Sequence, residues 1–410
     1  MSAGPISEVC MEDDKREVLL KVDHLTQSFK MGRSEFKAVD DVSFEIRKGE
    51  VFGLVGESGC GKTTTGRSIL KIYDITGGSI YFKGQRICAG VRTYKDAIKA
   101  ARKELKTCTD ESRRAELEKE IEDSRKEITK ARYDHKMCDK EYARKLVAET
   151  DEKYKKLIAE AKSPEEASKL RKEYRKERSI ASKTRLITKI QMIFQDPIAS
   201  LDPRMTVREI ISEGLIINGI KDKEYIDERV YEILELVGLV REHAGRYPHE
   251  FSGGQRQRIG IARSVVMRPE MIIADEPVSA LDVSIQAQVI NLLNELREQF
   301  DLTIMFIAHD LSVVKYFSDR IGVMYFGKMV ELTTSDELFA HPLHPYTKSL
   351  LSAIPLPDPR SEKKRTRIVY NALAEHDYST DKPSLREIVP GHFVHCNDAE
   401  EEKYKKELGV

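Results

Sequence analysis

The residues Gly56-Glu57-Ser58-Gly59-Cys60-Gly61-Lys62-Thr63 form the pattern GxxxxGK[ST] directly after the apolar run Val51–Val55. An apolar strand, this glycine-rich loop and a helix, here from Gly61, together make the context in which the pattern binds phosphate. Glycines let backbone N–H groups turn toward phosphate oxygens. Lys62 brings a positive charge to the β- and γ-phosphates, and Thr63 offers a hydroxyl to Mg²⁺. The loop therefore predicts a site for a nucleoside triphosphate.

Strand and helix patterns alternate on both sides of this loop. Strands are expected at Val18–Val22, Val42–Ile46, Val51–Val55, Ser79–Lys83, Ile190–Phe194, Met271–Ala274 and Leu302–Ala308. Helices are expected at Asp222–Val237 and Val283–Gln299. Apolar strands that alternate with helices favour a mostly parallel sheet with helices on its faces. The sequence therefore predicts an α/β fold.

The composition excludes several classes of protein. The chain carries 69 Lys and Arg and 69 Asp and Glu, so its formal net charge is zero, and no basic surplus argues for nucleic acid. Its apolar runs are far shorter than the ~20 residues that cross a bilayer, and its first residues lack the apolar stretch of a signal peptide. The six cysteines include no CxxC pair. We therefore expect a soluble intracellular protein without disulfides or a zinc site.

The segment 91–185 differs sharply in composition from the rest of the chain. Its 95 residues contain no glycine, one proline (Pro164) and 50 charged side chains, of which 29 are basic and 21 acidic. Helix formers dominate, and Glu122 and Lys126 form one of several i,i+4 pairs in the favourable order. Apolar residues are too sparse for a globular core, and Ser163 can cap a helix that begins at Pro164. We expect a helical hairpin or short coiled coil that projects into solvent and interrupts the domain.

Several residues further along the chain can complete a site for triphosphate hydrolysis. They are Gln195, the stretch Ser252-Gly253-Gly254-Gln255, the pair Asp275 and Glu276, Asp282 and His309. Each has an ordinary explanation when taken singly. Ser252 can be the N-cap of the helical run that follows it, and a lone histidine at the end of a strand, such as His309, is more often structural than catalytic.

Together and in this order, these residues resemble the motifs of the ATP-binding-cassette family. The resemblance implies a phosphate-loop NTPase (RecA-like) core, an antiparallel β subdomain and a helical signature subdomain, with ATP and Mg²⁺ as cofactors. It assigns the nucleotide contacts to Phe29, Gly56, Glu57, Ser58, Gly59, Cys60, Gly61, Lys62, Thr63, Thr64, Ser252, Gly253, Gly254, Gln255, Asp275 and Asp282. Phe29 matches the aromatic residue that stacks on adenine. Phe36 is a rival for that role, and a place in the core is equally open to both.

The resemblance also implies how hydrolysis proceeds. Glu276 would polarise the attacking water, His309 would hold Glu276 and the γ-phosphate in register, and Gln195 would sense Mg²⁺ and relay closure to membrane subunits. Thr63, Gln195 and Asp275 would hold the metal ion. Two cassettes would clasp two ATP molecules head to tail, with the signature stretch of one cassette facing the phosphate loop of the other.

Longer segments resemble one branch of the family, the F-type ATP-binding subunits of oligopeptide and dipeptide importers. They are Ala38–Phe44, Gly53–Lys62, Gln191–Pro197, Arg246–Glu250, Ala274–Val283 and His341–Thr347. This branch implies a peripheral subunit on the cytoplasmic face of the membrane. Its partners would be a second cassette of the same or another kind, two transmembrane permeases and an extracytoplasmic peptide-binding protein, with no nucleic acid.

An alternative function is that of a DNA-maintenance or repair ATPase, since these also split a cassette with a coiled coil and the basic excess of 91–185 can contact phosphates. That segment, however, is short and lacks an apical CxxC pair. Its own role is open between a solvated spacer and docking to a membrane subunit, anionic lipid or a regulator.

The resemblance divides the chain into an ATP-binding cassette (1–90 and 186–340, with the signature helices at about 200–268), the charged insertion (91–185) and a C-terminal extension (341–410). The insertion is longer than the usual connection in this family. Many relatives also carry four cysteines for an iron–sulfur cluster in the C-terminal region. Here Cys396 alone is retained, which is too few ligands, so we expect no iron–sulfur cluster.

Overall fold

The computed structural model describes residues 16–32, 34–161, 163–354, 367–378 and 381–409. The larger of two sheets contains β3 (Val51–Val55), β6 (Ile190–Ile193), β7 (Met271–Asp275), β8 (Thr303–Ala308), β9 (Arg320–Tyr325), β10 (Lys328–Thr334), β11 (Ser384–Val389) and β12 (His392–Cys396). Its order is β11-β12-β10-β9-β3-β8-β7-β6. Strand β3 is central and runs parallel to β8 and β9 on either side, so the loop that leaves its carboxyl end lies at the middle of the sheet.

The smaller sheet is antiparallel and lies beside the larger one. It has the order β2-β1-β4-β5 and contains β1 (Val18–Met31), β2 (Ser34–Arg47), β4 (Gly77–Phe82) and β5 (Gln85–Ala89). The two sheets share a core, in which the rings of Phe44 from β2 and Phe52 from β3 stack with centroids 5.1 Å apart. This contact fixes the antiparallel sheet against the strand that carries the phosphate loop.

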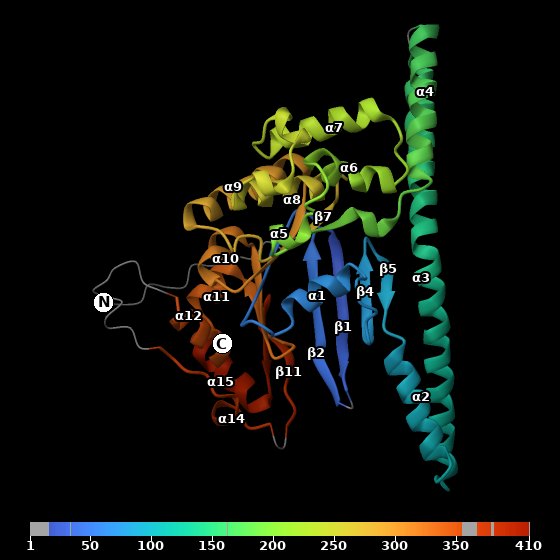
Figure 1. Cartoon of the computed structure of the whole chain (residues 1–410). Helices are drawn as coiled ribbons and strands as arrows, with labels where there is room; N and C mark the ends of the chain where they lie inside the picture. The colour runs from blue at the N-terminus through green and yellow to red at the C-terminus, as the bar shows by residue number, and fades with distance from the viewer. Residues whose placement is uncertain (1–15, 33, 162, 355–366, 379–380, 410) are drawn as a thin grey trace, which may run out of the picture.

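Helices outside the segment 91–185 flank the two sheets (Figure 1). They are α1 (Lys62–Ile69), α5 (Pro197–Ser200), α6 (Val207–Ile217), α7 (Lys223–Leu236), α8 (Gly253–Val265), α9 (Val283–Phe300), α10 (Leu311–Phe317), α11 (Ser335–Ala340), α12 (Pro345–Ser352), α14 (Ala372–Glu375) and α15 (Asp398–Leu408). Helices α6 to α9 share one apolar core with strands β3, β7 and β8. The expected fold class, a phosphate-loop core with an antiparallel sheet and a helical region, is confirmed.

The segment 91–185 forms three helices, α2 (Arg92–Leu105), α3 (Glu111–Ala159) and α4 (Pro164–Ala181). With 49 residues, α3 is about 70 Å long. Helix α2 packs on its first turns and α4 on its last turns, so two helical hairpins share one long helix (Figure 1). The expected helix start at Pro164 is confirmed, with the Ser163 side chain accepting a hydrogen bond from the Glu166 N–H.

The middle of α3 does not project into solvent, which corrects part of the sequence-based expectation. Tyr142 is 5% exposed and belongs to the core shared by the two sheets. Arg86 on β5 donates to Asp134 at 2.7 Å, and the Leu186 N–H donates to Asp139 at 2.9 Å. The apolar stripe of α3 is thin because a single edge of the small sheet has to be covered, and a few well-placed side chains suffice for that.

Other differences also concern strands: β9 and β10, which lie inside the large sheet, were not expected. Strand β5 was not expected, and β1 continues to Met31 rather than ending at Val22. Strands β11 and β12 come from the segment after residue 341, which was expected to be an extension of the cassette. They instead extend the large sheet, because β12 pairs antiparallel with β10 and β11 pairs with β12. The C-terminal residues are therefore joined to the same sheet that carries the phosphate loop.

Candidate functional site

The loop between β3 and α1 has a backbone that only glycine allows at two positions. Gly56 has φ +148° and Gly61 has φ +108°, and a Cβ atom at either would lie 2.2 Å from the Met324 carbonyl or 2.3 Å from the Ala38 carbonyl, respectively. Both the sign of φ and the close backbone approach exclude a side chain. The loop is therefore folded tightly against β2 and β9.

Lys62 lies inside this loop. Its side chain is 4% exposed overall, and Nζ donates to the carbonyl oxygens of Gly56 at 2.7 Å and Glu57 at 2.9 Å. A buried ammonium group needs such partners, since an unpaired charge is strongly disfavoured away from water. The lysine also borders the open cavity beside the loop. Its ammonium group can therefore form an ion pair with a phosphate that enters there.

A cavity of about 580 Å³ opens beside the loop, within the size range of pockets for small ligands. Its lining residues are Phe29, Phe36, Ala38, Ser58, Gly59, Gly61, Lys62, Thr63, Thr64, Gln195, Glu276 and His309. The two rival aromatic residues are both present, paired across β1 and β2. Phe29 packs edge-on against Tyr73 with centroids 5.2 Å apart, whereas Phe36 is 49% exposed, so both rings border the same end of the cavity.

Thr63 and Asp275 meet at the base of this cavity. The Thr63 hydroxyl donates to Asp275 Oδ1 at 2.7 Å. Asp275, at the end of β7, is completely buried, and its Oδ2 is without a hydrogen-bond partner among the described residues. Burial raises the pKa of Asp275 above its ordinary value, an effect opposed by the hydrogen bond from Thr63. A buried carboxylate oxygen left unpaired in this way is suited to a cation or to water bound to one.

Glu276, Gln195 and His309 converge at the mouth of the cavity. Oε2 of Glu276 accepts a hydrogen bond from Gln195 Nε2 at 2.9 Å and lies 3.1 Å from His309 Nδ1. Glu276 follows β7 with φ +45°, and its N–H donates to the Ile307 carbonyl of β8. This turn directs the carboxylate into the cavity while Asp275 stays buried beneath it. The three residues predicted to be catalytic are thus brought together.

The signature stretch and Asp282 do not line the cavity within this chain. Ser252 caps α8, where its hydroxyl accepts a hydrogen bond from the Gln255 N–H and the Gln255 side chain accepts one from the Ser252 N–H. A Cβ atom at Gly254 would lie 2.7 Å from Ile285 on α9, so α8 packs closely on α9. Asp282 begins α9 without capping it through its side chain. Their predicted role in nucleotide binding stays a prediction.

Two residues at the site had no role assigned from the sequence. Ala38 lines the cavity, and its carbonyl crowds Gly61. The hydroxyl of Tyr346 accepts a hydrogen bond from the Glu57 N–H at 3.0 Å. Tyr346 belongs to the segment His341–Thr347, so a family resemblance marked it, but no local pattern indicates that it meets a residue 289 positions earlier.

The described residues contain no group of three His, Cys, Asp or Glu side chains placed to hold a metal ion. Cys396 is buried on β12, and burial raises its pKa to about 12. The expected absence of an iron–sulfur cluster stays a prediction. No helix among the described ranges combines the length and the apolar character needed to span a membrane.

Comparisons with known proteins identify the family to which the chain belongs. The family model described as ABC transporter matches residues 39–186 and 155–279, and the one described as oligopeptide/dipeptide transporter, C-terminal region, matches residues 330–381. The chain is 48% identical to the oligopeptide transport ATP-binding protein OppF of Bacillus subtilis over 94% of its own length and 98% of that protein. It is 45% identical to the dipeptide transport ATP-binding protein DppF of Lactococcus lactis over 97% and 99%.

Solved structures show the same fold at lower sequence identity. CbiO1 of Clostridium perfringens, part of an ABC transporter complex, aligns with a TM-score of 0.51 and 21% identity, covering 85% of this chain and 98% of that chain. None of these similarities favours the alternative of a DNA-maintenance ATPase. With relatives above 40% identity over nearly their full length and matches to both family models, this chain belongs to the ABC transporter family, as an ATP-binding-cassette ATPase of its oligopeptide/dipeptide transport branch.

Proposed function

We propose that this chain binds and hydrolyses ATP in the cavity beside its phosphate loop and couples that cycle to the uptake of oligopeptides or dipeptides. The observation that carries the proposal is the convergence of Lys62, Gln195, Glu276 and His309 on one cavity from four separate segments of the chain. The peptide assignment rests on the C-terminal match and on the names of the relatives.

In this proposal the triphosphate takes the place that the loop carbonyls hold around Lys62. Phosphate oxygens can replace the Gly56 and Glu57 carbonyls as partners of Nζ, and they accept hydrogen bonds from the loop amides and from the N-terminus of α1. At the other end of the cavity, Phe29 or the more exposed Phe36 offers a ring face to adenine. The aromatic end and the cationic end of the cavity thus match the two ends of ATP.

Mg²⁺ fits the pair Thr63 and Asp275. Asp275 Oδ2 is buried and unpaired among the described residues, and the Thr63 hydroxyl adjoins Oδ1, so both groups are available to the cation or to its water ligands, with Gln195 at the cavity mouth as a third contact. When bound there, Mg²⁺ neutralises charge on the phosphate oxygens. The part played by the chain itself is to keep a carboxylate buried and directed at this position.

Glu276 is the residue placed to orient the attacking water. Its carboxylate is held from two sides by Gln195 and His309, and its side chain is 13% exposed. A carboxylate fixed in this way presents its remaining lone pairs to the cavity, where a water molecule can be hydrogen-bonded in line with the γ-phosphate. His309 then contacts both Glu276 and the phosphate.

The signature stretch acts, in this proposal, on the nucleotide of a second cassette. Helix α8 begins at Gly253, and both Gly253 and its N-cap Ser252 are exposed, which makes this helix end a favourable place for a phosphate. Since this end of α8 lies outside the chain's own cavity, a head-to-tail pair of cassettes would complete both sites. The partner can be another copy or a related chain.

The remaining partners follow from the branch of the family. Two transmembrane permeases would bind the cassette pair at the cytoplasmic face of the membrane, and an extracytoplasmic binding protein would deliver the peptide. The chain would be attached to the membrane through the permeases, because no described helix is suited to span it.

Reconstitution in liposomes tests this proposal. The chain, the partner cassette, both permeases and the binding protein are assembled, and uptake of a labelled oligopeptide is followed with ATP on the cassette side. We expect ATP-dependent uptake with the wild-type chain and its loss with Glu276→Gln. Leu157→Ala on α3, 38% exposed and far along the chain from every site residue, is the matched control and should transport normally. ATP hydrolysis without peptide uptake by the complete assembly would contradict the transport function.

A further inference from the structure

The phosphate loop is held from behind by the C-terminal part of the chain. The Glu57 N–H donates to the Tyr346 hydroxyl at 3.0 Å. Ser58, Gly59 and Gly61 line the cavity but Glu57 does not, so this amide lies on the side of the loop that a phosphate does not reach. Tyr346 is 1% exposed. The hydroxyl is therefore a buried, fixed partner for this amide of the phosphate loop.

Tyr346 is itself held firmly at the start of α12. His344 is the N-cap of this helix, and its Nδ1 accepts a hydrogen bond from the Tyr346 N–H at 3.1 Å. The N–H groups of Leu343 and His344 donate to the two carboxylate oxygens of Glu331 at 2.8 and 3.0 Å. Glu331 lies on β10 and is completely buried. The backbone that carries Tyr346 is therefore fixed to the large sheet.

Packing of aromatic rings fixes the side chain as well. Tyr346 contacts Tyr325 with centroids 4.4 Å apart and Tyr370 at 5.5 Å. Tyr325 ends β9, and two residues later the Gly327 N–H donates to the Cys60 carbonyl at 2.9 Å. The loop is thus contacted from behind at two points, once by a tyrosine hydroxyl and once by the backbone of the β9–β10 turn.

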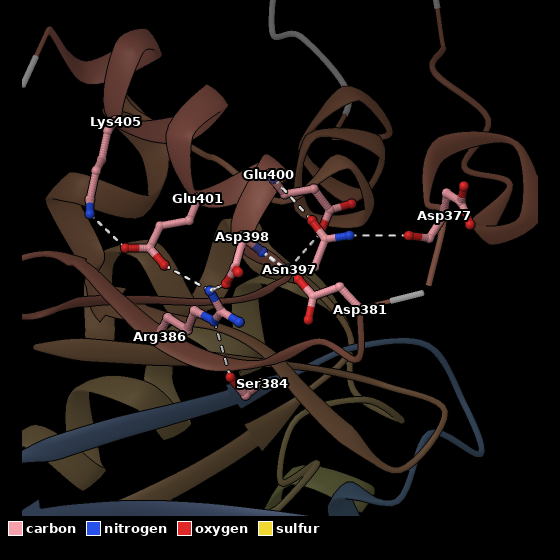
Figure 2. Close-up of polar contacts among 9 residues, drawn as sticks. All are labelled: Asp377, Asp381, Ser384, Arg386, Asn397, Asp398, Glu400, Glu401 and Lys405. Atoms are coloured by element: carbon pink, nitrogen blue, oxygen red, sulfur yellow. Dashed lines mark hydrogen bonds and ion pairs between the residues drawn. The ribbon is translucent and has the colours of Figure 1, made fainter. Parts of the chain in front are cut away.

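The last helix supports this arrangement (Figure 2). Glu400 on α15 forms a capping box with Asn397 and also pairs with His376, whose ring stacks on His344 at 5.1 Å. Arg386 on β11 pairs with Asp398 and Glu401, which ties α15 to the edge of the sheet. A continuous set of contacts therefore runs from α15 through His376 and His344 to Tyr346.

We propose that Tyr346 is a positioning residue, which keeps the phosphate loop in its ATP-binding conformation and makes the described C-terminal residues (341–354, 367–378 and 381–409) a structural part of the nucleotide site. This inference rests on the proposed function of the cavity as an ATP site. The hydroxyl restrains Glu57, whose carbonyl is one of the two that hold Lys62. Without it, the loop would sample conformations in which its amides and Lys62 no longer converge on the cavity, and ATP would have to select the competent one.

Tyr346→Phe tests the inference, since it removes the hydroxyl and keeps the ring. Tyr370→Phe is the matched control, because Tyr370 packs in the same ring cluster and makes no hydrogen bond to the loop among the described residues. Three quantities are measured with the full chain: the Kd for ATP, the hydrogen-exchange rate of the loop peptide that contains Glu57, and the melting temperature. In the assembled transporter, KM for ATP and kcat are measured separately.

For Tyr346→Phe we expect a Kd and a KM about three- to tenfold higher, the effect of one neutral hydrogen bond, with faster exchange at Glu57 and kcat within about twofold. Tyr370→Phe should leave the exchange at Glu57 and the Kd unchanged. Wild-type values for exchange and Kd in folded Tyr346→Phe would overturn the inference, even if its melting temperature fell. If Lys62→Ala also bound ATP normally, the proposed ATP site itself would be at fault.

Discussion

The nucleotide site and the helical segment 91–185 are built in opposite ways. The cavity takes a few residues from each of several distant segments, and most of them have a proposed chemical task. The helical segment takes 95 consecutive residues, and it is attached to the rest of the domain through a few side chains in the middle of α3, among them Tyr142, Asp134 and Asp139. Chemistry that needs a particular atom at a particular place restricts residue types strongly, whereas covering a sheet edge restricts them weakly.

The two regions also differ in the surroundings of their polar side chains. Gln195, Glu276 and His309 form hydrogen bonds beside an open cavity, an arrangement suited to contact with a ligand. Pairs on α3, such as Glu122 with Lys126 at 2.8 Å, have side chains about two-thirds exposed, and exposed pairs contribute little to stability. Changes at the site should therefore affect turnover with little effect on folding. Changes at the exposed pairs of α3 should affect neither, and changes at its buried contacts should affect folding.

The largest effect is expected from Glu276→Gln. The amide keeps the shape of the side chain and one hydrogen-bond acceptor but cannot take a proton from water, so ATP turnover should fall about 100-fold or more. The affinity for ATP and the melting temperature should stay close to those of the wild type. Steady-state ATPase assays and ATP titration of the same preparation measure both. Substantial turnover by the pure variant would show that another group activates the water.

The next effect concerns attachment of the long helix. Tyr142→Ala removes a ring that is 5% exposed in the shared core, and it should lower the free energy of unfolding by about 3 kcal/mol. Leu157→Ala, on the same helix but 38% exposed, should change it by less than about 0.5 kcal/mol. Denaturant unfolding compares the two variants. Equal, small effects would mean that α3 is not docked through Tyr142.

A smaller effect is expected from pH. Burial, and then repulsion from His376 and His395, lowers the pKa of His344 to about 3, against about 6.5 for an exposed histidine. Between these two values the unfolded chain binds the proton and the folded chain does not, so this residue makes the free energy of unfolding rise with pH. The stability it contributes is complete above pH 6.5 and is lost progressively as the pH falls toward 3.

His344→Asn isolates that contribution. Asparagine is a favourable N-cap residue and can keep the hydrogen bond from the Tyr346 N–H, but it does not titrate in this range. Melting temperatures recorded from pH 7 to pH 4.5 should fall less steeply for His344→Asn than for the wild type. Parallel curves would show that the protonation of His344 does not destabilise the fold.

Much of the site was predictable because its motifs have local consequences. Glycine at positions 56 and 61 indicates a backbone conformation that excludes a Cβ atom. The acidic pair Asp275 and Glu276 stands at the end of an apolar run, which marks the end of β7. The alternation of strands and helices indicated the parallel sheet for the same reason. In each case a short stretch contains the information for its own conformation.

The rest depends on contacts between distant residues, which a single sequence does not display. Strand β5 shows no alternation of polar and apolar residues, and β12 joins the sheet by pairing with β10, a residue run far from it in the sequence. The burial of Tyr142 could not be predicted, because the sequence does not show which face of α3 meets the small sheet. The contact between Tyr346 and Glu57 spans 289 residues, and nothing in either local pattern indicates the other.

The contrast between the two regions depends on the proposal that the cavity beside the phosphate loop is an ATP site. The most direct test is a titration of the purified full-length chain with ATP and Mg²⁺, carried out for the wild type, Lys62→Ala and Leu157→Ala. Loss of the charged donor should weaken binding about 10- to 100-fold, whereas Leu157→Ala should bind as the wild type does. An unchanged Kd for folded Lys62→Ala would contradict the account, because ATP would then bind outside this cavity.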